Sequence, residues 1–469
     1  MAFLVAGTLR VAVQMADIRE SLGRKGRYSV LHPRVALMLS SPGVPAVTIA
    51  ALEGVLRALG FESLEQKVVP VQSFSEELVQ FREQLDAQGD PISCTLVALV
   101  TLRGQLRWPL KLAQELNGCG VLWGCPKLFL LLSIAPGVTP ESGSFLHHLA
   151  ELCGHCPHWS LLQLLTEVFR RVTESAGGTF CPVLRSSLRG ALCLGNVQAW
   201  ESELDSGLKA QYDLSGVRVA LLLGMIRGRP GAQCDMEALG SLCQTLGFET
   251  TVRTDPTAQA FQEELAKFQE QLTTCRDPVS CALVALMAHG GPQGRLLGAD
   301  GQEVQPEALL LELSRCEALQ GCPKIFLLQA CRGGHRDLGV ATTVSWFWRR
   351  LCSRPPTIPS HADVLQVYAD VQGSSFRGHP PRTADHADIL MVYSAAEGCV
   401  AYRDDKGSDF IQTLVEVVGA DPGRDLLELM TEVNRQVCEL DVLGPDSDKP
   451  HKACLEIRSS LRRSLCLRA

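Results

Sequence analysis

The sequence predicts an α/β fold, a mostly parallel central sheet flanked by helices in three layers. We expect this fold twice, as a tandem pair whose first copy is incomplete. Short apolar runs bounded by glycine, proline or charge alternate with segments that carry apolar residues at helical spacing. Such alternation is typical of βαβ units. Blocks of sequence also recur in one order at few offsets, which indicates a duplication.

The elements are clearest in the second copy. The runs Val217 to Leu223, Ala282 to Met287 and Lys324 to Leu328 are short and apolar, so we expect buried parallel strands. The segments 235–246 and 257–272, between the first two runs, are expected helices. Four apolar residues of the longer helix fall on one face: Phe261, Leu265, Phe268 and Leu272.

Repeated blocks define the two copies. Phe74-Ser-Glu-Glu-Leu78 recurs as Phe261-Gln-Glu-Glu-Leu265, 187 positions later. Near the ends of the copies, Arg185-Ser-Ser-Leu188 matches Arg458-Ser-Ser-Leu461 at an offset of 273. The growing offset shows that the first copy lacks a segment that the second carries at about 336–406.

That extra segment contains a shorter echo. His361-Ala-Asp-Val-Leu365 recurs as His386-Ala-Asp-Ile-Leu390, 25 positions later. Only the later copy is followed by a Tyr-Arg pair, so we expect 386–394 to be the strand of the second core. The earlier copy is then extra.

Composition excludes several classes of protein. Of 469 residues, 46% are hydrophobic and 20% charged, so disorder is not the main state. The net charge of −7 and the lack of a basic run argue against nucleic acid as a partner. No apolar run is long enough to span a membrane, and we recognise no secretory signal. With 19 cysteines we therefore expect reduced thiols in a cytoplasmic protein that can also reach the nucleus, without a membrane partner.

Two strand ends in the second copy carry the chemistry. Ala288-His289-Gly290-Gly291 follows one apolar run, and Gln329-Ala330-Cys331-Arg332-Gly333 follows the next. Carboxyl ends of parallel strands share one edge of a sheet, so an imidazole and a thiol should meet there. The imidazole can take the thiol proton, and the N–H groups of Gly290 and Cys331 can hold an oxyanion. Alone, each residue would more often be a buried cysteine or a loop histidine. The five-residue context, with the histidine 42 positions upstream, favours a catalytic pair.

On these motifs the second copy resembles the caspase family of aspartate-directed cysteine proteases, and most of all its short-prodomain epidermal branch. The resemblance implies a six-stranded caspase-like fold, a zymogen processed by proteolysis, no cofactor, and a role in apoptosis or in differentiation. It also implies a pocket for a substrate aspartate, built here from Arg229, Gln329 and Arg403, with Tyr402 lining the neighbouring subsite. Arg227 is the alternative to Arg229, since one gap would exchange them.

The resemblance also suggests how the chain divides. We expect a large-subunit-like segment at 212–335, an intersubunit linker with the duplicated strand at 336–385, and a small-subunit-like segment at 386–469. Before them lie an N-terminal extension (1–29), the degenerate caspase-like copy (30–195) and a linker (196–211). That last linker offers Asp205 as a processing candidate.

The first copy lacks the chemistry. Leu102, Arg103, Ile134, Leu132 and Pro42 stand where the second copy has His289, Gly290, Cys331, Gln329 and Arg229. The first copy keeps a predicted helix at 159–172 and a predicted terminal strand at 183–194. It is either a passenger or an internal partner that pairs through the terminal strand, which would make the protein a pseudo-dimer rather than a homodimer.

A cluster of histidines and cysteines in the first copy has metal-ligand chemistry: His147, His148, Cys153, His155, Cys156 and His158. The second copy has no such cluster and no second spaced pair exists, so we predict no metal.

The main prediction is a cysteine endopeptidase acting on protein substrates after aspartate. The alternative is a catalytically silent regulator that pairs with active caspases.

Overall fold

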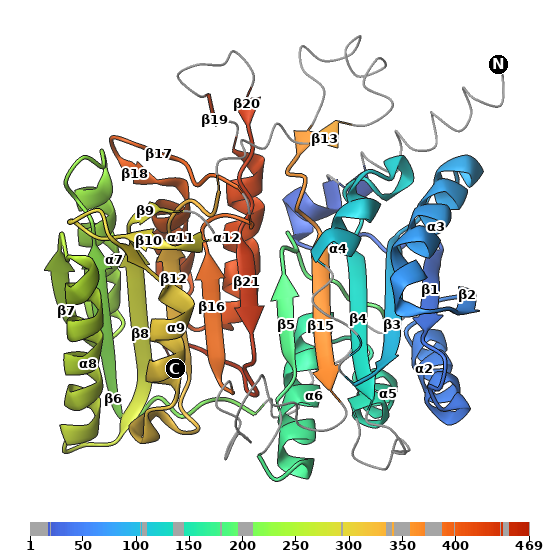
Figure 1. Cartoon of the computed structure of the whole chain (residues 1–469), viewed down its shortest axis with the longest axis horizontal. Helices are drawn as coiled ribbons and strands as arrows, with labels where there is room; N and C mark the ends of the chain where they lie inside the picture. Colours follow the sequence, from blue (N-terminus) through green and yellow to red (C-terminus); the bar gives the residue numbers. More distant parts are fainter. Residues whose placement is uncertain are drawn as a thin grey trace. The chain divides into compact units, whose positions relative to one another are not determined.

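The computed structural model describes residues 17–18, 20–103, 105, 110–134, 145–178, 181–195, 210–291, 294–333, 340–341, 357–370, 387–397, 399–440, 442–443 and 450–468. The chain forms two compact units. The first comprises 1–207 and 339–383, and the second comprises 208–338 and 384–469. Each unit has its own sheet and helices (Figure 1).

The second unit contains a sheet in the order β7-β6-β8-β12-β16-β21. Neighbouring strands are parallel except for β21, which is antiparallel to β16. The strands are β6 (Val217–Gly224), β7 (Phe248–Thr254), β8 (Val279–Met287), β12 (Lys324–Gln329), β16 (Ile389–Tyr393) and β21 (Glu456–Ser459). The predicted α/β class is therefore confirmed in this unit.

Helices cover both faces of this sheet (Figure 1). One face packs on α8 (Ala258–Thr274) and α9 (Pro306–Ser314). The other packs on α7 (Ala232–Thr245), α11 (Asp409–Ala420) and α12 (Leu426–Glu439). The expected apolar face of α8 is confirmed, because its four predicted residues are all buried. Short strands lie outside the sheet: β9 (His289–Gly290), β10 (Leu296–Leu297), β11 (Glu303–Val304), β17 (Arg403–Asp404), β18 (Gly407–Ser408), β19 (Val442–Leu443) and β20 (Pro450–His451).

The first unit repeats this plan, in the order β2-β1-β3-β4-β15-β5. Its strands are β1 (Arg34–Ser40), β2 (Ser63–Val68), β3 (Cys94–Leu102), β4 (Lys127–Ile134), β15 (Val364–Asp370) and β5 (Val183–Ser186). Its helices are α2 (Ala46–Ala58), α3 (Phe74–Gln88), α4 (Leu110–Asn117), α5 (Phe145–His155) and α6 (Leu161–Ser175). The predicted helix at 159–172 corresponds to α6, and the predicted strand at 183–194 ends earlier, at Ser186.

The strand β15 departs from our expectation. We took the echo beginning at His361 to be extra, but β15 pairs parallel with β4 and antiparallel with β5. It therefore occupies the place in the first sheet that β16 occupies in the second. Residues 340–341 (β13) pair with 357–358 (β14) just before it. The first copy's own segment is one strand short, and the linker at 336–385 supplies the missing strand. The other expected domain boundaries stay predictions.

Candidate active site

Strand register brings the predicted dyad to one edge of the second sheet. In the parallel pair β8–β12, Met287 lies opposite Gln329. The Ala288 N–H then donates to the Gln329 carbonyl at 3.1 Å. Because both strands end here, His289 and Cys331 leave the sheet at the same edge.

Gly290 lies directly against the nucleophile loop. A Cβ added at this position would overlap the carbonyl oxygen of Cys331. Only glycine lets the two loops approach so closely. The two loops are therefore in direct contact, and Sγ of Cys331, a half-buried residue, lies 3.7 Å from the Ala401 carbonyl oxygen.

The residue after the cysteine anchors this loop. The Arg332 N–H donates to the Cys399 carbonyl at 2.9 Å, and its guanidinium donates to Glu456 at 2.7 Å. The same guanidinium lies over the Tyr393 ring, 4.1 Å from its centroid. On the other side, the Ala330 N–H donates to the Ser394 hydroxyl at 3.2 Å. The backbone around Cys331 is therefore fixed from two directions.

Of the three polar residues of the expected pocket, Arg229 and Gln329 are buried and Arg403 is half-buried. Arg229 is 6% exposed and donates to the Met225 carbonyl at 2.9 Å, while Gln329 is 1% exposed. Nη1 of Arg403 and Oε1 of Gln329 are buried and have no hydrogen-bond partner among the described residues. Buried polar groups are normally paired, so these atoms point to a missing polar ligand.

Positive charge dominates this region. Burial, followed by the charge of Arg403, lowers the pKa of Arg229 to about 10. Burial also lowers the pKa of Arg403. The pKa of His289 is lowered from its ordinary 6.5, first by burial and then by Arg229 and Arg403. Such a site favours an anion and keeps the imidazole neutral at neutral pH.

Asp235 is a positioning residue that the sequence analysis missed. Its carboxylate is 1% exposed and accepts from the Ser408 N–H at 2.9 Å and from the Gln412 amide at 2.9 Å. Its negative charge raises the pKa of both Arg229 and Arg403, opposing the effect of burial. One buried carboxylate facing two arginines leaves an excess positive charge. An aspartate in the first turn of a helix gave no sequence signal for this role.

Tyr402 has an unexpected neighbour. Its ring stacks on that of His451, with centroids 6.0 Å apart and planes 12° apart. His451 is 3% exposed, and neither ring nitrogen has a hydrogen-bond partner among the described residues. The two rings come from segments almost fifty residues apart, so no local sequence motif links them.

The alternative arginine lies elsewhere. The Arg227 side chain is 86% exposed and lies 3.5 Å from the Asp255 carboxylate. Arg229, in contrast, is buried and lies close enough to Arg403 for that charge to lower its pKa. This geometry favours Arg229 as the pocket residue. Asp205 lies outside the described residues.

The equivalent edge of the first unit is apolar. Leu102 lies opposite Ile134 in the pair β3–β4, and Leu132 and Ile134 are each 1% exposed. These residues offer no proton acceptor and no nucleophile.

Known proteins resemble the second unit. A family model described as the caspase domain matches residues 217–465. The chain belongs to the caspase family. Human caspase-14 is 41% identical over 260 residues, which cover 55% of this chain and 96% of that protein. Mouse caspase-14 is 39% identical over 284 residues, which cover 57% of this chain and 99% of that protein. The match to the crystal structure of caspase-1 from Spodoptera frugiperda covers 55% of this chain and 93% of the caspase-1 chain. Its sequence identity is 24% and its TM-score is 0.43.

Membership of the caspase family makes the chain a relative of cysteine peptidases, as the sequence predicted.

No described helix is both long and apolar enough to cross a membrane. Among the residues that the structure describes, no three or more histidine, cysteine or acidic side chains are placed to hold a metal ion. In the histidine–cysteine cluster, burial followed by Cys156 raises the pKa of Cys153 to about 11, and His148 contacts the Ser175 hydroxyl at 3.3 Å.

Proposed function

We propose that the second unit is a cysteine endopeptidase that cleaves protein substrates after aspartate. The observation that carries the proposal is the edge shared by β8 and β12. Its register leads His289 and Cys331 out of the sheet at one edge. The charges of Arg229, which is buried, and of Arg403, which is half-buried, both act on His289. A nucleophile, a base and an anion pocket at one strand edge suffice for this reaction.

The reaction begins with proton transfer from the Cys331 thiol to the neutral imidazole of His289. The thiolate attacks the carbonyl carbon of the scissile bond, and the N–H groups of Gly290 and Cys331 bind the oxyanion. His289 then gives its proton to the leaving amine as the tetrahedral intermediate collapses to a thioester. Water, deprotonated by His289, hydrolyses the thioester and restores the thiol.

The pocket explains the preference for aspartate. A carboxylate would pair with the guanidinium groups of Arg229 and Arg403, and the Gln329 amide would donate to it after rotation of its end group. Asp235 offsets only one of these two charges, so an uncharged residue would leave the excess positive charge without a partner, which is costly.

An aldehyde probe with a terminal aspartate tests the dyad in the full chain. We expect covalent labelling that Cys331→Ala abolishes. Cys234→Ala is the matched control, because Cys234 is exposed on α7 and outside the dyad. Labelling that survives Cys331→Ala, or a folded chain that never reacts, would refute the proposed peptidase.

A folded but silent chain would support the regulator, which the apolar strand edge of the first unit also favours. Pairing through the terminal strand, processing after Asp205 and a cytoplasmic location stay predictions. N-terminal sequencing of the processed protein tests the cleavage, because a new start at Ser206 is required.

A further inference from the structure

We propose that residues 1–207 of the first unit form a binding module for one strand and that its ligand is residues 357–370 of this chain, here called the linker segment. The linker segment lies between Cys331 and β16 in the sequence, yet it completes the sheet of the first unit. This proposal is independent of peptidase activity.

Backbone pairing places the linker segment inside the sheet rather than at its edge. β15 pairs with β4 from Val364↔Lys127 to Asp370↔Ser133, and with β5 from Leu365↔Ser186 to Tyr368↔Val183. Leu365 and Val367 are buried, with exposures of 1% and 6%. A strand with partners on both sides and buried side chains is part of the core.

A buried polar triad fixes the position of the linker segment. Arg189 donates to the two carboxylate oxygens of Asp363 at 2.8 and 2.7 Å, and the Tyr28 hydroxyl donates to the same carboxylate at 2.7 Å. The side chain of Asp363 is fully buried. Burial and then the charge of Asp363 raise the pKa of Tyr28, so the phenol stays a donor.

The second unit contains the same triad. Tyr212 donates to Asp388 at 2.6 Å, and Arg462 donates to that carboxylate at 2.9 and 2.5 Å. Both aspartates have a positive φ, 64° at Asp363 and 63° at Asp388. The backbone carbonyl of each aspartate also accepts from a lysine backbone N–H at 2.8 Å, from Lys127 in the first unit and from Lys324 in the second.

The difference lies in where the aspartate comes from. In the second unit Asp388 belongs to the unit's own small-subunit-like segment. In the first unit Asp363 comes from the linker of the other copy. The first copy therefore kept Tyr28 and Arg189 but relies on the linker segment for their partner and for its missing strand.

The consequence is that the linker segment is held by the first unit rather than free. Proteolysis on both sides of the linker segment would leave it bound to the first unit as a separate peptide. The first unit thus has a role that needs no catalytic residue: it retains the middle of the linker after the chain on either side is cut.

Hydrogen exchange in the full chain tests the assignment. Arg189→Ala removes one partner of a buried ion pair, so we expect exchange in 364–370 to rise about a hundredfold. Exchange in β16 should stay unchanged. Arg462→Ala is the matched control and should have the reverse effect. Asp363→Asn repeats the test at constant size if Arg189→Ala unfolds the unit. The proposal would be overturned if Arg189→Ala raised hydrogen exchange equally in β15 and β16, or left exchange in 364–370 unchanged.

Cutting the linker gives a second readout. Recognition sites for a specific protease are placed within 342–356 and 371–385 of a Cys331→Ala chain, and the cut protein is passed over a sizing column. The linker segment should elute with one copy of the chain and be lost in Arg189→Ala. Release of the linker segment from the cut chain that retains Arg189 would contradict the assignment. So would a particle of two chains in which each binds the other's linker segment.

Discussion

At His289 three effects act in one direction. Burial, Arg229 and Arg403 all disfavour the imidazolium, so the imidazole is neutral at neutral pH. A bound substrate carboxylate would offset the two arginine charges and raise the proton affinity of the imidazole. Recognition of aspartate would thereby make His289 a better acceptor for the Cys331 proton.

We predict that Arg229→Gln raises the pKa of His289. Removing a nearby positive charge makes protonation easier, so the midpoint moves up toward the ordinary 6.5. NMR titration in a Cys331→Ala background measures this, with the signal assigned by its loss in His289→Gln. Arg229→Lys retains the charge and should leave the midpoint unchanged. An unchanged midpoint in Arg229→Gln would mean that burial and Arg403 depress this pKa without a contribution from Arg229.

Arg403 provides the second test at the residue scale. Arg403→Lys retains the charge but loses the planar fork that grips a carboxylate. We expect kcat/KM for aspartyl peptides to fall about ten- to a hundredfold, since hydrogen bonds to charged groups contribute about 1.5–3 kcal/mol. Arg253→Lys, exposed on β7, is the control. Alkylation of Cys331 by iodoacetamide should stay unaffected, and an equal loss there would indicate a damaged dyad instead.

At the scale of elements, local pattern predicted most of the second unit. The apolar runs became β6, β8, β12 and β16, and each begins or ends within a few residues of its prediction. The same runs predicted that His289 and Cys331 follow two neighbouring strand ends, because strand ends are local features. Their role as a catalytic dyad stays a prediction. Asp235 and His451 could not be found this way, since their roles depend on segments distant in the sequence.

The fate of β15 shows the limit of local reasoning. The two echoes share the sequence His-Ala-Asp and an apolar run, so pattern alone cannot say which sheet each one joins. The missing information is long-range: Tyr28 and Arg189 in the first copy match Tyr212 and Arg462 in the second. Each pair requires a buried carboxylate, and two aspartates were available.

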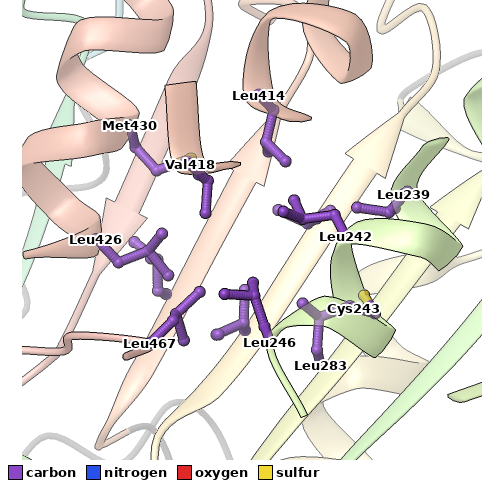
Figure 2. A pocket seen from close by; sticks show the side chains of 13 residues that line it. Leu239, Leu242, Cys243, Leu246, Leu283, Leu414, Val418, Leu426, Met430 and Leu467 are labelled. Carbon is purple, nitrogen blue, oxygen red and sulfur yellow. The ribbon is translucent and has the colours of Figure 1, made fainter. Parts of the chain in front are cut away.

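The helix layer of the second unit contains a packing defect. Figure 2 shows apolar side chains of α7, α11 and α12 around a pocket beside the sheet. The volume of this cavity is about 20 Å³. Val418 lines the cavity and is 1% exposed. A purely apolar void of this size has room for one small group and gives a water no partners.

We predict that Val418→Ile stabilises the second unit. The added methylene enters the cavity and should increase the free energy of unfolding by about 0.5–1 kcal/mol. The midpoint of urea unfolding measures the change. Val415→Ile, half-buried on the same helix and away from the cavity, should have less effect. Destabilisation by Val418→Ile would show that the cavity cannot accept the added group without strain.

For the whole molecule, the path of the chain makes the two units interdependent. The sequence leaves the second unit after Leu338, supplies a strand to the first, and returns at 384. Removing residues 1–207 would therefore strip β15 of both its pairing partners, β4 and β5. Leu365, Val367 and Ala369, all buried in the intact protein, would face water in a chain that still carries them.

We predict that a chain beginning at Leu208 aggregates, because an unpaired apolar strand is a template for association. Replacing 357–370 by glycine and serine in that chain should restore a dispersed protein, measured by light scattering after a sizing column. The same replacement in the full-length chain should instead destabilise it, because the first unit then lacks a core strand. If the replacement leaves the full chain unharmed, the linker segment is dispensable to the first unit and the two units are independent.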